Sequence, residues 1–559
     1  MPCLPLNFRH DAVLQPGAGA MLLGAMQDWP LRVMRLVDHA EREHGDGEIV
    51  SALADGSVTR TNWRRVAHEA RQMAQALERL GIRPGDRVAT LAMNHSRHLT
   101  AWYGACGMGG VLHTINPRLF DDQLDYIANH AEDRVLLYDR AFQPIIDRMK
   151  PRWRTIEHYV CFDPAEGEAG FADWIAPEDG NYAWVEGDER EPCGLCYTSG
   201  TTGNPKGVLY EHRSTVLHTM ASITPDVFDL SRRSVVLPIV PMFHANAWGI
   251  PWSTPASGAK LVLSADYRPE SMCRLIREEG VTHSAGVPTI WMTMIEYVER
   301  TGEDLGSLSQ VTIGGSAAPR AMIGWFKKRG IDIGHAWGMT ETSPIGTCRS
   351  KPANWDSLSD DEQLDLVAKQ GKAPFGVELR VVDDDGTELP RDGTSSGRLQ
   401  CRGPWVVKRY FKEKTDCLDA EGWFDTGDVA VIHPNGTMQI TDRSKDVIKS
   451  GGEWISSIDL ENAAVGCPGV AEAAAIAIPH PKWDERPLLL IVRGEGSSVT
   501  EQQIRDHLGG AVSKWWQPDA IEFVEELPHS ATGKLSKKTL RDLYRDYRFA
   551  DAVDMVGRD

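Results

Sequence analysis

The segment Tyr197-Thr-Ser-Gly-Thr-Thr-Gly-Asn-Pro-Lys-Gly207 indicates the fold more strongly than any other part of the chain. Its glycines let backbone N–H groups approach a ligand closely, its hydroxyl groups donate hydrogen bonds, and Lys206 adds a positive charge. The residues from Cys193 have the pattern of a buried strand, so we expect a strand that leads into a loop able to wrap a polyphosphate. A flexible linker of this composition would lack the strand before it and the lysine at its end. The loop is not a Walker A sequence, because Pro205 and Gly207 stand where that pattern has Gly and Ser or Thr.

Helix and strand patterns alternate around this loop, which is typical of layered α/β folds. Apolar residues from 62 to 80 recur at helical spacing, Gly81 ends the helix, and residues 88–93 form a short apolar run typical of a buried strand. The same order of helix, turn and strand returns at 271–287 and 320–336. These patterns predict a large N-terminal body of α/β layers.

The pattern changes after about residue 375, where strand-like segments alternate with Asp-Gly and Asn-Gly turns and predict a β-rich subdomain over 375–442. Helices and strands return after Asp442. We therefore place an N-terminal domain at 1–442 and a small, mobile α+β C-terminal domain at 443–559. The polar stretch Lys351–Gly371 is predicted to be an exposed insertion. The elements predicted for the two later parts are strands at 377–383, 397–402, 437–441 and 470–478 and helices at 457–465 and 500–509.

Composition excludes several classes of protein. The chain has 559 residues, with 60 Lys+Arg and 79 Asp+Glu, and its net charge of −19 argues against a nucleic-acid binder. No apolar window is long enough for a transmembrane segment and the start lacks the pattern of a secretory signal, so we expect a cytoplasmic protein. Ten irregularly spaced cysteines do not suggest a disulfide framework. Cys193 and Cys196 lack the further ligands of a zinc site, so we interpret them as core residues.

Further motifs show which family the chain resembles. The glycine-rich loop and five later segments resemble, in order, the signature motifs of the AMP-forming acyl-adenylating superfamily, which includes acyl- and aryl-CoA synthetases, adenylation domains and luciferases. The five segments are GGSAA at 314–318, HAWGMTET at 335–342, WFDTGD at 423–428, DRSKDVIKSGG at 442–452 and PHSATGK at 528–534. The resemblance covers nearly the whole chain.

The resemblance implies an acid–CoA ligase that works in two steps. A carboxylate is a poor electrophile, so ATP converts the acid into an acyl-AMP anhydride with release of pyrophosphate, and coenzyme A then accepts the acyl group. Negative charge gathers around the α-phosphorus in the first step, which calls for Mg²⁺ and for a cation near the transferring oxygens. Mg²⁺ is thus the expected cofactor, and ATP, coenzyme A and a small carboxylic acid are the expected substrates.

The motifs carry over residues for the phosphates and the metal. Lys534 would be the catalytic cation, Thr340 would contact the α-phosphate, and Glu341 would hold Mg²⁺ together with Thr198. The other residues expected at the phosphates are Ser199, Gly200, Thr201, Thr202, Gly203 and Lys206.

A second group would hold the nucleoside. Trp337 stands where the superfamily places an aromatic ring against adenine, whereas Asp428 and Arg443 would bind the ribose. The other residues implied for the nucleotide are Gly315, Ser316, Ala317, His335, Ala336 and Gly338, of which Gly315 and Gly338 would also border the acid.

The segment from Pro241 to Pro251 resembles the lining of the acyl tunnel in fatty acyl-CoA synthetases. His244, counted here among the catalytic residues, and Ala245 would border the carboxylate and phosphate, and Trp248 would be a gate to the tunnel. Lys445 would be the hinge about which the C-terminal domain turns. The loop brought to the thiol would contain Lys449, Gly451, Gly452 and Trp454.

We therefore predict an acyl-CoA synthetase for a medium- or long-chain fatty acid. A short substituted acid such as methylthiopropionate and an aryl acid such as cinnamate remain alternatives, because the tunnel segment does not reveal its depth. An adenylation enzyme that loads a carrier protein and a luciferase-type monooxygenase would share the motifs. A catalytically dead nucleotide or acyl sensor would often have lost Lys534 or Glu341, and both are present. The sequence leaves a homodimer open.

Overall fold

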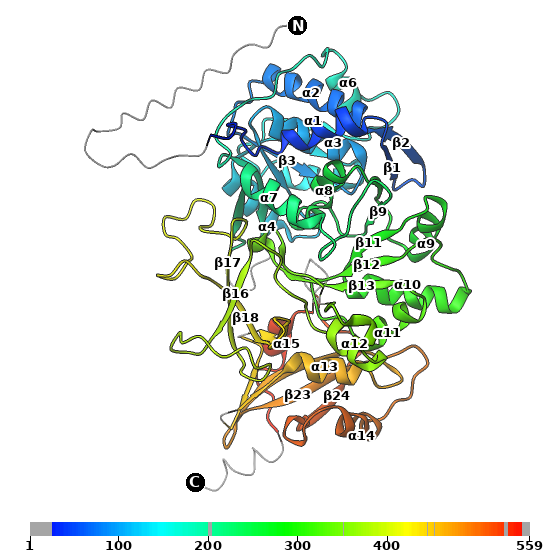
Figure 1. The fold of residues 1–559 in the computed structure, drawn as a ribbon, viewed down its shortest axis with the longest axis vertical. Helices are drawn as coiled ribbons and strands as arrows, with labels where there is room; N and C mark the ends of the chain where they lie inside the picture. The colour runs from blue at the N-terminus through cyan, green and yellow to red at the C-terminus, as the bar shows by residue number, and fades with distance from the viewer. Residues whose placement is uncertain are drawn as a thin grey trace, which may run out of the picture.

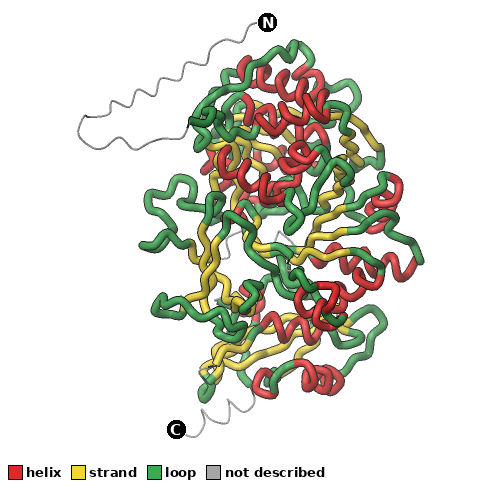
Figure 2. Tube along the Cα trace, in the orientation of Figure 1, coloured by secondary structure: helices red, strands yellow, loops and turns green. Residues whose placement is uncertain are grey.

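The computed structural model describes residues 25–198, 204–349, 351–443, 445–451, 453–529 and 535–549. A large body of helices and sheets occupies the upper part of Figure 1, a smaller sheet lies at its left side, and the segment after residue 445 forms a separate layer below. Figure 2 shows that helices flank the strands of the body, whereas the sheet at the left consists of strands and loops. This is the α/β class that the sequence predicts.

Two mostly parallel sheets form the body. The first has the strand order β6-β5-β3-β4-β7-β8, in which only β8 runs antiparallel to its neighbour. Its strands are β3 (Arg87–Leu91), β4 (Val111–Thr114), β5 (Asp133–Tyr138), β6 (His158–Cys161), β7 (Pro192–Tyr197) and β8 (Gly207–Glu211). The second has the order β13-β12-β11-β9-β10-β1-β2, in which only β2 is antiparallel. Its strands are β1 (Glu48–Ala52), β2 (Val58–Asn62), β9 (Val235–Pro238), β10 (Lys260–Ser264), β11 (His283–Gly286), β12 (Gln310–Ile313) and β13 (Asp332–His335).

The largest hydrophobic core lies between these sheets, because it contains Leu112 of the first sheet and Leu261 of the second together with Trp102 of α3. Ten of the twelve residues of α3 are buried, as expected for a helix packed on several sides. The helices of the body are α1 (Met34–His44), α2 (Trp63–Arg79), α3 (Ser96–Gly107), α4 (Asp121–Ala131), α5 (Gln143–Met149), α6 (Phe171–Ile175), α7 (His212–Ser222), α8 (Ile250–Ser257), α9 (Pro269–Glu278), α10 (Pro288–Thr301), α11 (Arg320–Lys328) and α12 (Asp360–Val367).

Smaller sheets complete the fold. Antiparallel strands in the order β16-β17-β18-β19 form the predicted β-rich part, and β14 pairs with β15 beside it. These strands are β14 (Trp337–Gly338), β15 (Ile345–Thr347), β16 (Glu378–Val382), β17 (Gly397–Arg402), β18 (Phe424–Ile432) and β19 (Met438–Arg443). The lower layer contains β20 (Ile448–Ser450), β21 (Glu453–Ile455), β22 (Val470–His480), β23 (Asp484–Arg493), β24 (Ala520–Phe523), α13 (Ser457–Val465), α14 (Glu501–Ala511) and α15 (Lys537–Leu543). The domain boundary between residues 442 and 443 stays a prediction.

Most predicted elements are confirmed, and helix α2 begins and ends at residues that suit helix ends. The Asn62 side chain accepts the N–H of Arg65 at the start of α2, and Gly81 has φ +76° just beyond its end. Cys193 and Cys196 are buried core residues, as predicted.

No element was predicted for β20, β21, β23, β24 and α15, and two further regions differ from the sequence prediction. Strand β18 was not predicted, because Thr-Gly-Asp interrupts its apolar pattern. The stretch Lys351–Gly371 is not a simple exposed insertion, since it contains α12, which packs against α11 through Leu364. Ion pairs from Arg320 to Asp361 and from Lys327 to Asp360, at 3.0 and 2.8 Å, join the two helices. None of the described helices is both long and apolar enough to cross a membrane.

Candidate active site

The glycine-rich loop lies between the last two strands of the first sheet, β7 and β8. The N–H of Thr198 donates to the carbonyl of Lys206 at 2.9 Å and closes the loop at its base. The hydroxyl of Tyr197 shares a hydrogen bond of 2.7 Å with Nδ1 of His130, which fixes the end of β7. The predicted phosphate-binding residues Ser199, Gly200, Thr201, Thr202 and Gly203 lie outside the described residues.

Glu341 lies near Lys206 although 135 positions separate them in the sequence. Its side chain is buried, and one carboxylate oxygen accepts the hydroxyl of Tyr410 at 2.9 Å. The Lys206 ammonium lies 4.7 Å from the centre of the Tyr410 ring. Burial raises the pKa of Glu341, and the Tyr410 hydrogen bond opposes that effect. A nearby cation would therefore favour the charged form of this carboxylate.

The ends of β12 and β13 form the wall where the nucleotide is expected. In an open parallel sheet, ligands bind beyond the carboxyl ends of the strands, and the turn after β12 lies there. Gly315 has φ +86°, a conformation that glycine adopts most readily. His335 is buried at the end of β13, where Nε2 accepts the N–H of Ala318 and Nδ1 donates to the carbonyl of Val367. His335 thus holds the turn that contains Ser316 and Ala317.

Trp337 and Asp428 are in direct contact. The indole N–H of Trp337 donates to Oδ2 of Asp428 at 2.9 Å, and the Arg443 Nε lies 3.4 Å from Oδ1. Asp428 and Arg443 face each other across β18 and β19. Gly338 follows, and a Cβ there would lie 1.7 Å from the carbonyl oxygen of Pro344, so only glycine fits. The structure therefore brings three predicted nucleotide residues together.

Thr340 begins the short turn Thr340–Thr342 and is half-buried. The hydroxyl of Tyr210 donates to the Thr340 carbonyl at 2.9 Å, and the N–H of Val407 donates to the Glu341 carbonyl at 2.8 Å. Both residues of the predicted phosphate and metal pair are thus held by their backbones.

The predicted hinge, Lys445, lies in the segment that joins the body to the lower layer. Lys445 lies in a turn where the N–H groups of Asp446 and Val447 both donate to the Arg443 carbonyl at 2.9 Å. Lys449 lies on β20, where its N–H donates to Glu485. The backbone of Trp454 pairs with that of Lys449, and Gly451 lies at the turn between them. Gly452 and Lys534 lie outside the described residues.

The acyl segment follows β9 and has an unusual backbone. Residues from Ala245 to Gly249 all have φ between +42° and +79°, a left-handed turn that costs most residues about 1–2 kcal/mol each. The amide of Asn94 fixes the start of the segment, since its Nδ2 donates to the Val240 carbonyl and its Oδ1 accepts the N–H of Met242. Such strain persists only where the surroundings impose it, often at ligand sites.

Trp248 is buried next to the turn that follows β12, where the nucleotide is expected. A Cβ on Gly314 would lie 3.3 Å from the Trp248 ring, so the ring lies against the turn after β12. His244 is half-buried at the start of the left-handed turn. The roles of His244 and Trp248 at an acyl tunnel stay predictions.

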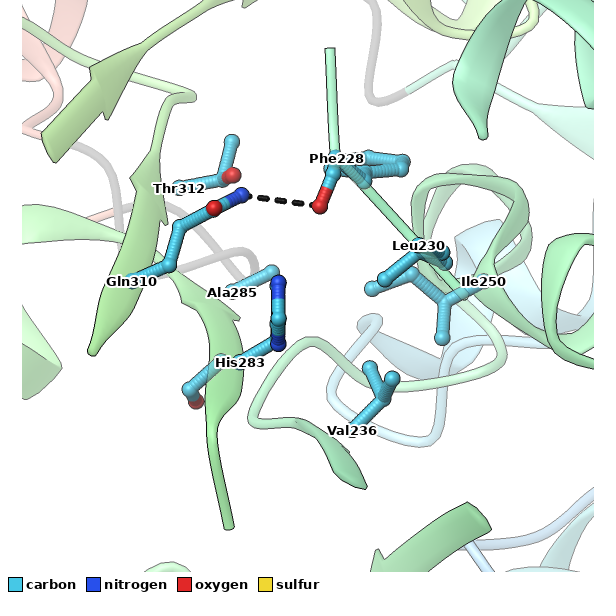
Figure 3. Close-up of a pocket in the computed structure, with 9 residues that line it drawn as sticks. Phe228, Leu230, Val236, Ile250, His283, Ala285, Gln310 and Thr312 are labelled. Atoms are coloured by element: carbon cyan, nitrogen blue, oxygen red, sulfur yellow. Dashed lines mark hydrogen bonds between the residues drawn. The ribbon is translucent and has the colours of Figure 1, made fainter. Parts of the chain in front are cut away.

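A small cavity of about 10 Å³ has Ile250 among its lining residues. Figure 3 shows Phe228, Leu230 and Ile250 on one side and Gln310, Thr312 and His283 on the other. The Gln310 amide is fixed because its Nε2 donates to the Phe228 carbonyl at 2.8 Å. The volume is about that of one water probe. One wall of the cavity is apolar and the opposite wall is mainly polar.

We expect the buried His218 to make the folded protein sensitive to acid. Burial lowers its pKa to about 3, and Nε2 accepts the N–H of Ile345 next to the Glu341 turn. As the pH falls, the unfolded chain therefore binds a proton at this residue before the folded protein does. The contribution of His218 to the free energy of unfolding is complete above about pH 6.5 and is lost progressively as the pH falls toward 3. At pH 5 this histidine should cost about 2 kcal/mol of unfolding free energy.

Urea unfolding of wild type and His218→Gln at pH 7 and pH 5 measures that cost. Between pH 7 and pH 5, the free energy of unfolding of the variant should fall by about 2 kcal/mol less than that of wild type, because glutamine does not titrate. His68→Gln, at an exposed histidine, should behave as wild type does. Equal losses in the His218 variant and wild type would contradict the prediction.

Sequence reasoning missed Tyr410, Tyr210 and Asn94. None of the three belongs to one of the sequence motifs. Asn94 and Tyr210 contact segments at least 130 positions away in the sequence, and Tyr410 lies 69 positions from Glu341. No spacing pattern could have revealed contacts of that kind.

Comparisons with known proteins show what the chain is similar to. A family model described as AMP-binding enzyme matches residues 37–411, and one described as AMP-binding enzyme C-terminal domain matches residues 459–534. The 3-methylmercaptopropionyl-CoA ligase of Ruegeria lacuscaerulensis is 49% identical over 94% of this chain and 99% of that protein. The medium-chain-fatty-acid–CoA ligase of Ectopseudomonas oleovorans is 47% identical over 94% and 98%. The solved structure of the anthranilate CoA ligase AuaEII in complex with anthranoyl-AMP aligns with a TM-score of 0.82, 26% identity and coverage of 93% and 98%.

Proposed function

We propose that this chain, which belongs to the AMP-binding enzyme family and is an ATP-dependent acid–CoA ligase, activates a medium- or long-chain fatty acid. The observation that carries the choice of acid is the burial of Trp248 against the turn after β12, in one hydrophobic cluster with Phe228, Leu230, Val236 and Ile250. A hydrocarbon tail gains about 0.8 kcal/mol for each methylene that it buries, so such a cluster favours it.

A short acid with a thioether is a second candidate. The cavity in Figure 3 holds about 10 Å³ and has Gln310 and His283 on its polar wall. A cavity of this volume is too small for a long tail unless neighbouring side chains move, whereas a short tail needs less room. The identity to a 3-methylmercaptopropionyl-CoA ligase, 49% against 47% for the medium-chain ligase, does not separate the two candidates.

The proposed roles follow from what each group can donate or accept. Lys206 and the loop after Thr198 would bind the phosphates, the Thr340 hydroxyl would contact the α-phosphate, and Asp428 would accept hydrogen bonds from the ribose hydroxyls. Two of the Asp428 lone-pair sites already face Trp337 and Arg443, and a carboxylate has about four, so two remain. The acid attacks the α-phosphorus, pyrophosphate leaves, and the thiol of coenzyme A then displaces AMP.

Mg²⁺ is the proposed metal, with Glu341 and Thr198 as its ligands. The residues present fit it, because Glu341 is a buried carboxylate whose raised pKa a cation would lower. No group of three or more His, Cys, Asp or Glu among the described residues could hold a metal. That agrees with Mg²⁺, which is usually bound by one or two carboxylates together with substrate phosphates. The bound metal would neutralise phosphate charge in the first step.

A panel of acids tests the function. The enzyme is mixed with ATP and butyrate, methylthiopropionate, octanoate, palmitate or cinnamate, with and without coenzyme A, and AMP and thioester are measured. Octanoate or palmitate should give the highest kcat/KM. A maximum at methylthiopropionate would select the second candidate. AMP without any thioester would favour a carrier-protein enzyme, and no AMP would favour a sensor. A cytoplasmic location and a homodimer stay predictions.

Trp248 should control the length of the accepted acid. Trp248→Ala removes the ring that lies against Gly314, so longer acids should gain about 10- to 200-fold in kcat/KM relative to short ones, the range expected for a methylene-scale change in a pocket. Chain-length profiles from C4 to C16 measure the shift, and Trp248→Phe should give an intermediate profile. An unchanged profile in the alanine variant would make Trp248 a packing residue only.

A further inference from the structure

Tyr410 contacts two groups of the candidate site at once. It lies in the loop between β17 and β18, outside every motif that the sequence shows. Its hydroxyl donates to Glu341 at 2.9 Å, and the face of its ring lies 4.7 Å from the Lys206 ammonium. The proposed metal carboxylate and a proposed phosphate cation thus share one side chain.

The loop that carries Tyr410 is fixed on both sides. The N–H of Val407 donates to the carbonyl of Glu341, and the N–H of Phe411 donates to the carbonyl of Gly207, both at 2.8 Å. Tyr410 is therefore attached through its neighbours to the two segments that its side chain touches. A side chain held in this way has little freedom to take another rotamer.

The hydroxyl remains a donor at neutral pH. Burial, and then the charge of Glu341, hold the pKa of Tyr410 well above its usual value. A hydrogen bond to an ionised carboxylate is about twice as strong as one between neutral groups. The Glu341 carboxylate keeps further lone pairs for a ligand, since Tyr410 uses only one of about four.

We propose that Tyr410 is a positioning residue for acyl-AMP formation: its hydroxyl orients the Glu341 carboxylate for the metal, and its ring holds the Lys206 ammonium beside it. This inference rests on the proposed role of Glu341. Partners of this kind behind a metal ligand typically change metal affinity or activity by about 10- to 100-fold when they are removed.

Tyr410→Phe is the sharpest variant, because it keeps the ring and removes only the hydroxyl. Mn²⁺ is the probe, and its binding to the enzyme with ATP is followed by electron paramagnetic resonance, without turnover. The Mn²⁺ dissociation constant should rise about 10- to 100-fold in the variant. Tyr297→Phe is the matched control, because Tyr297 of α10 donates to Glu303 at the same 2.9 Å and neither residue is proposed for the site, so this variant should bind Mn²⁺ as wild type does.

Glu341→Gln separates failure of this inference from failure of the proposed function. If Glu341→Gln leaves Mn²⁺ binding unchanged, Glu341 is not a metal ligand and the proposed function of that residue is wrong. If Glu341→Gln weakens binding and Tyr410→Phe does not, only the inference about Tyr410 is wrong. If both weaken it, the double variant should bind no more weakly than Glu341→Gln alone, because Tyr410 acts through Glu341.

Tyr410→Leu tests the role of the ring. It also replaces Tyr410→Phe as the test if that variant folds poorly. It removes the hydroxyl and the aromatic face together, so it should also weaken binding of metal-free ATP, which Tyr410→Phe should not. Lower thermal stability with unchanged Mn²⁺ and ATP binding in both variants would reduce Tyr410 to a packing residue and overturn the inference.

Discussion

Lys534→Ala should slow acyl-AMP formation by about 10²–10³-fold, the usual cost of losing one preorganised donor to developing charge. The same variant should convert preformed acyl-AMP into acyl-CoA at close to the wild-type rate, because the proposed cation acts in the first step only. Lys534 itself lies outside the described residues, but the ends of its segment are held together. The N–H of Ser536 donates to the Pro528 carbonyl at 2.7 Å, and His529 pairs with Leu535.

The segment after Lys534 is also attached to α13. The Lys537 ammonium donates to Ser457 at 2.6 Å and forms an ion pair with Glu461 at 2.8 Å, so the residue three positions after Lys534 is anchored in α13. Exchange of labelled pyrophosphate into ATP measures the first step without coenzyme A, and a rapid-quench assay with synthetic acyl-AMP measures the second. Lys538→Ala, at an exposed lysine, should leave both steps unchanged. Equal loss of both steps in Lys534→Ala would contradict a role confined to adenylation.

Lys445→Pro should have the opposite effect. Proline fixes φ near −65°, so the turn could not rotate, while the residues that form acyl-AMP would stay in place. Pyrophosphate exchange should continue, and thioester formation should fall by about 10²-fold or more, the cost of misplacing a reacting group. Lys445→Ala, which leaves the backbone free, should retain both steps.

A rotation at Lys445 would have to break contacts between Asp442 and Ser457. Oδ2 of Asp442, before the hinge, accepts both the N–H and the hydroxyl of Ser457, after the hinge, at 2.6 Å each. Stopped-flow measurement of each half-reaction in Lys445→Pro tests the rotation directly. Normal thioester formation in that variant would show that the C-terminal unit does not need to turn.

The sequence predicted the parts of this protein whose causes are local. An apolar period with Asn62 before it and Gly81 after it suffices to define α2, since capping and periodicity are properties of neighbouring residues. The alternation of such helices with short apolar strands predicted the α/β class. It failed at β18, because the polar residues Thr426 and Asp428 are buried there through contacts with other strands and with Trp337.

The sequence alone determined the family resemblance, the α/β layers and the chemistry of the motifs, because these depend on residue types at fixed spacings. Only the tertiary structure placed Tyr410 between Lys206 and Glu341, joined Trp337 to Asp428, and set Asn94 behind the acyl segment. Each of those contacts crosses from one sheet or loop to another. Their geometry follows from how the sheets pack, and packing sums many weak interactions that no short stretch of sequence contains.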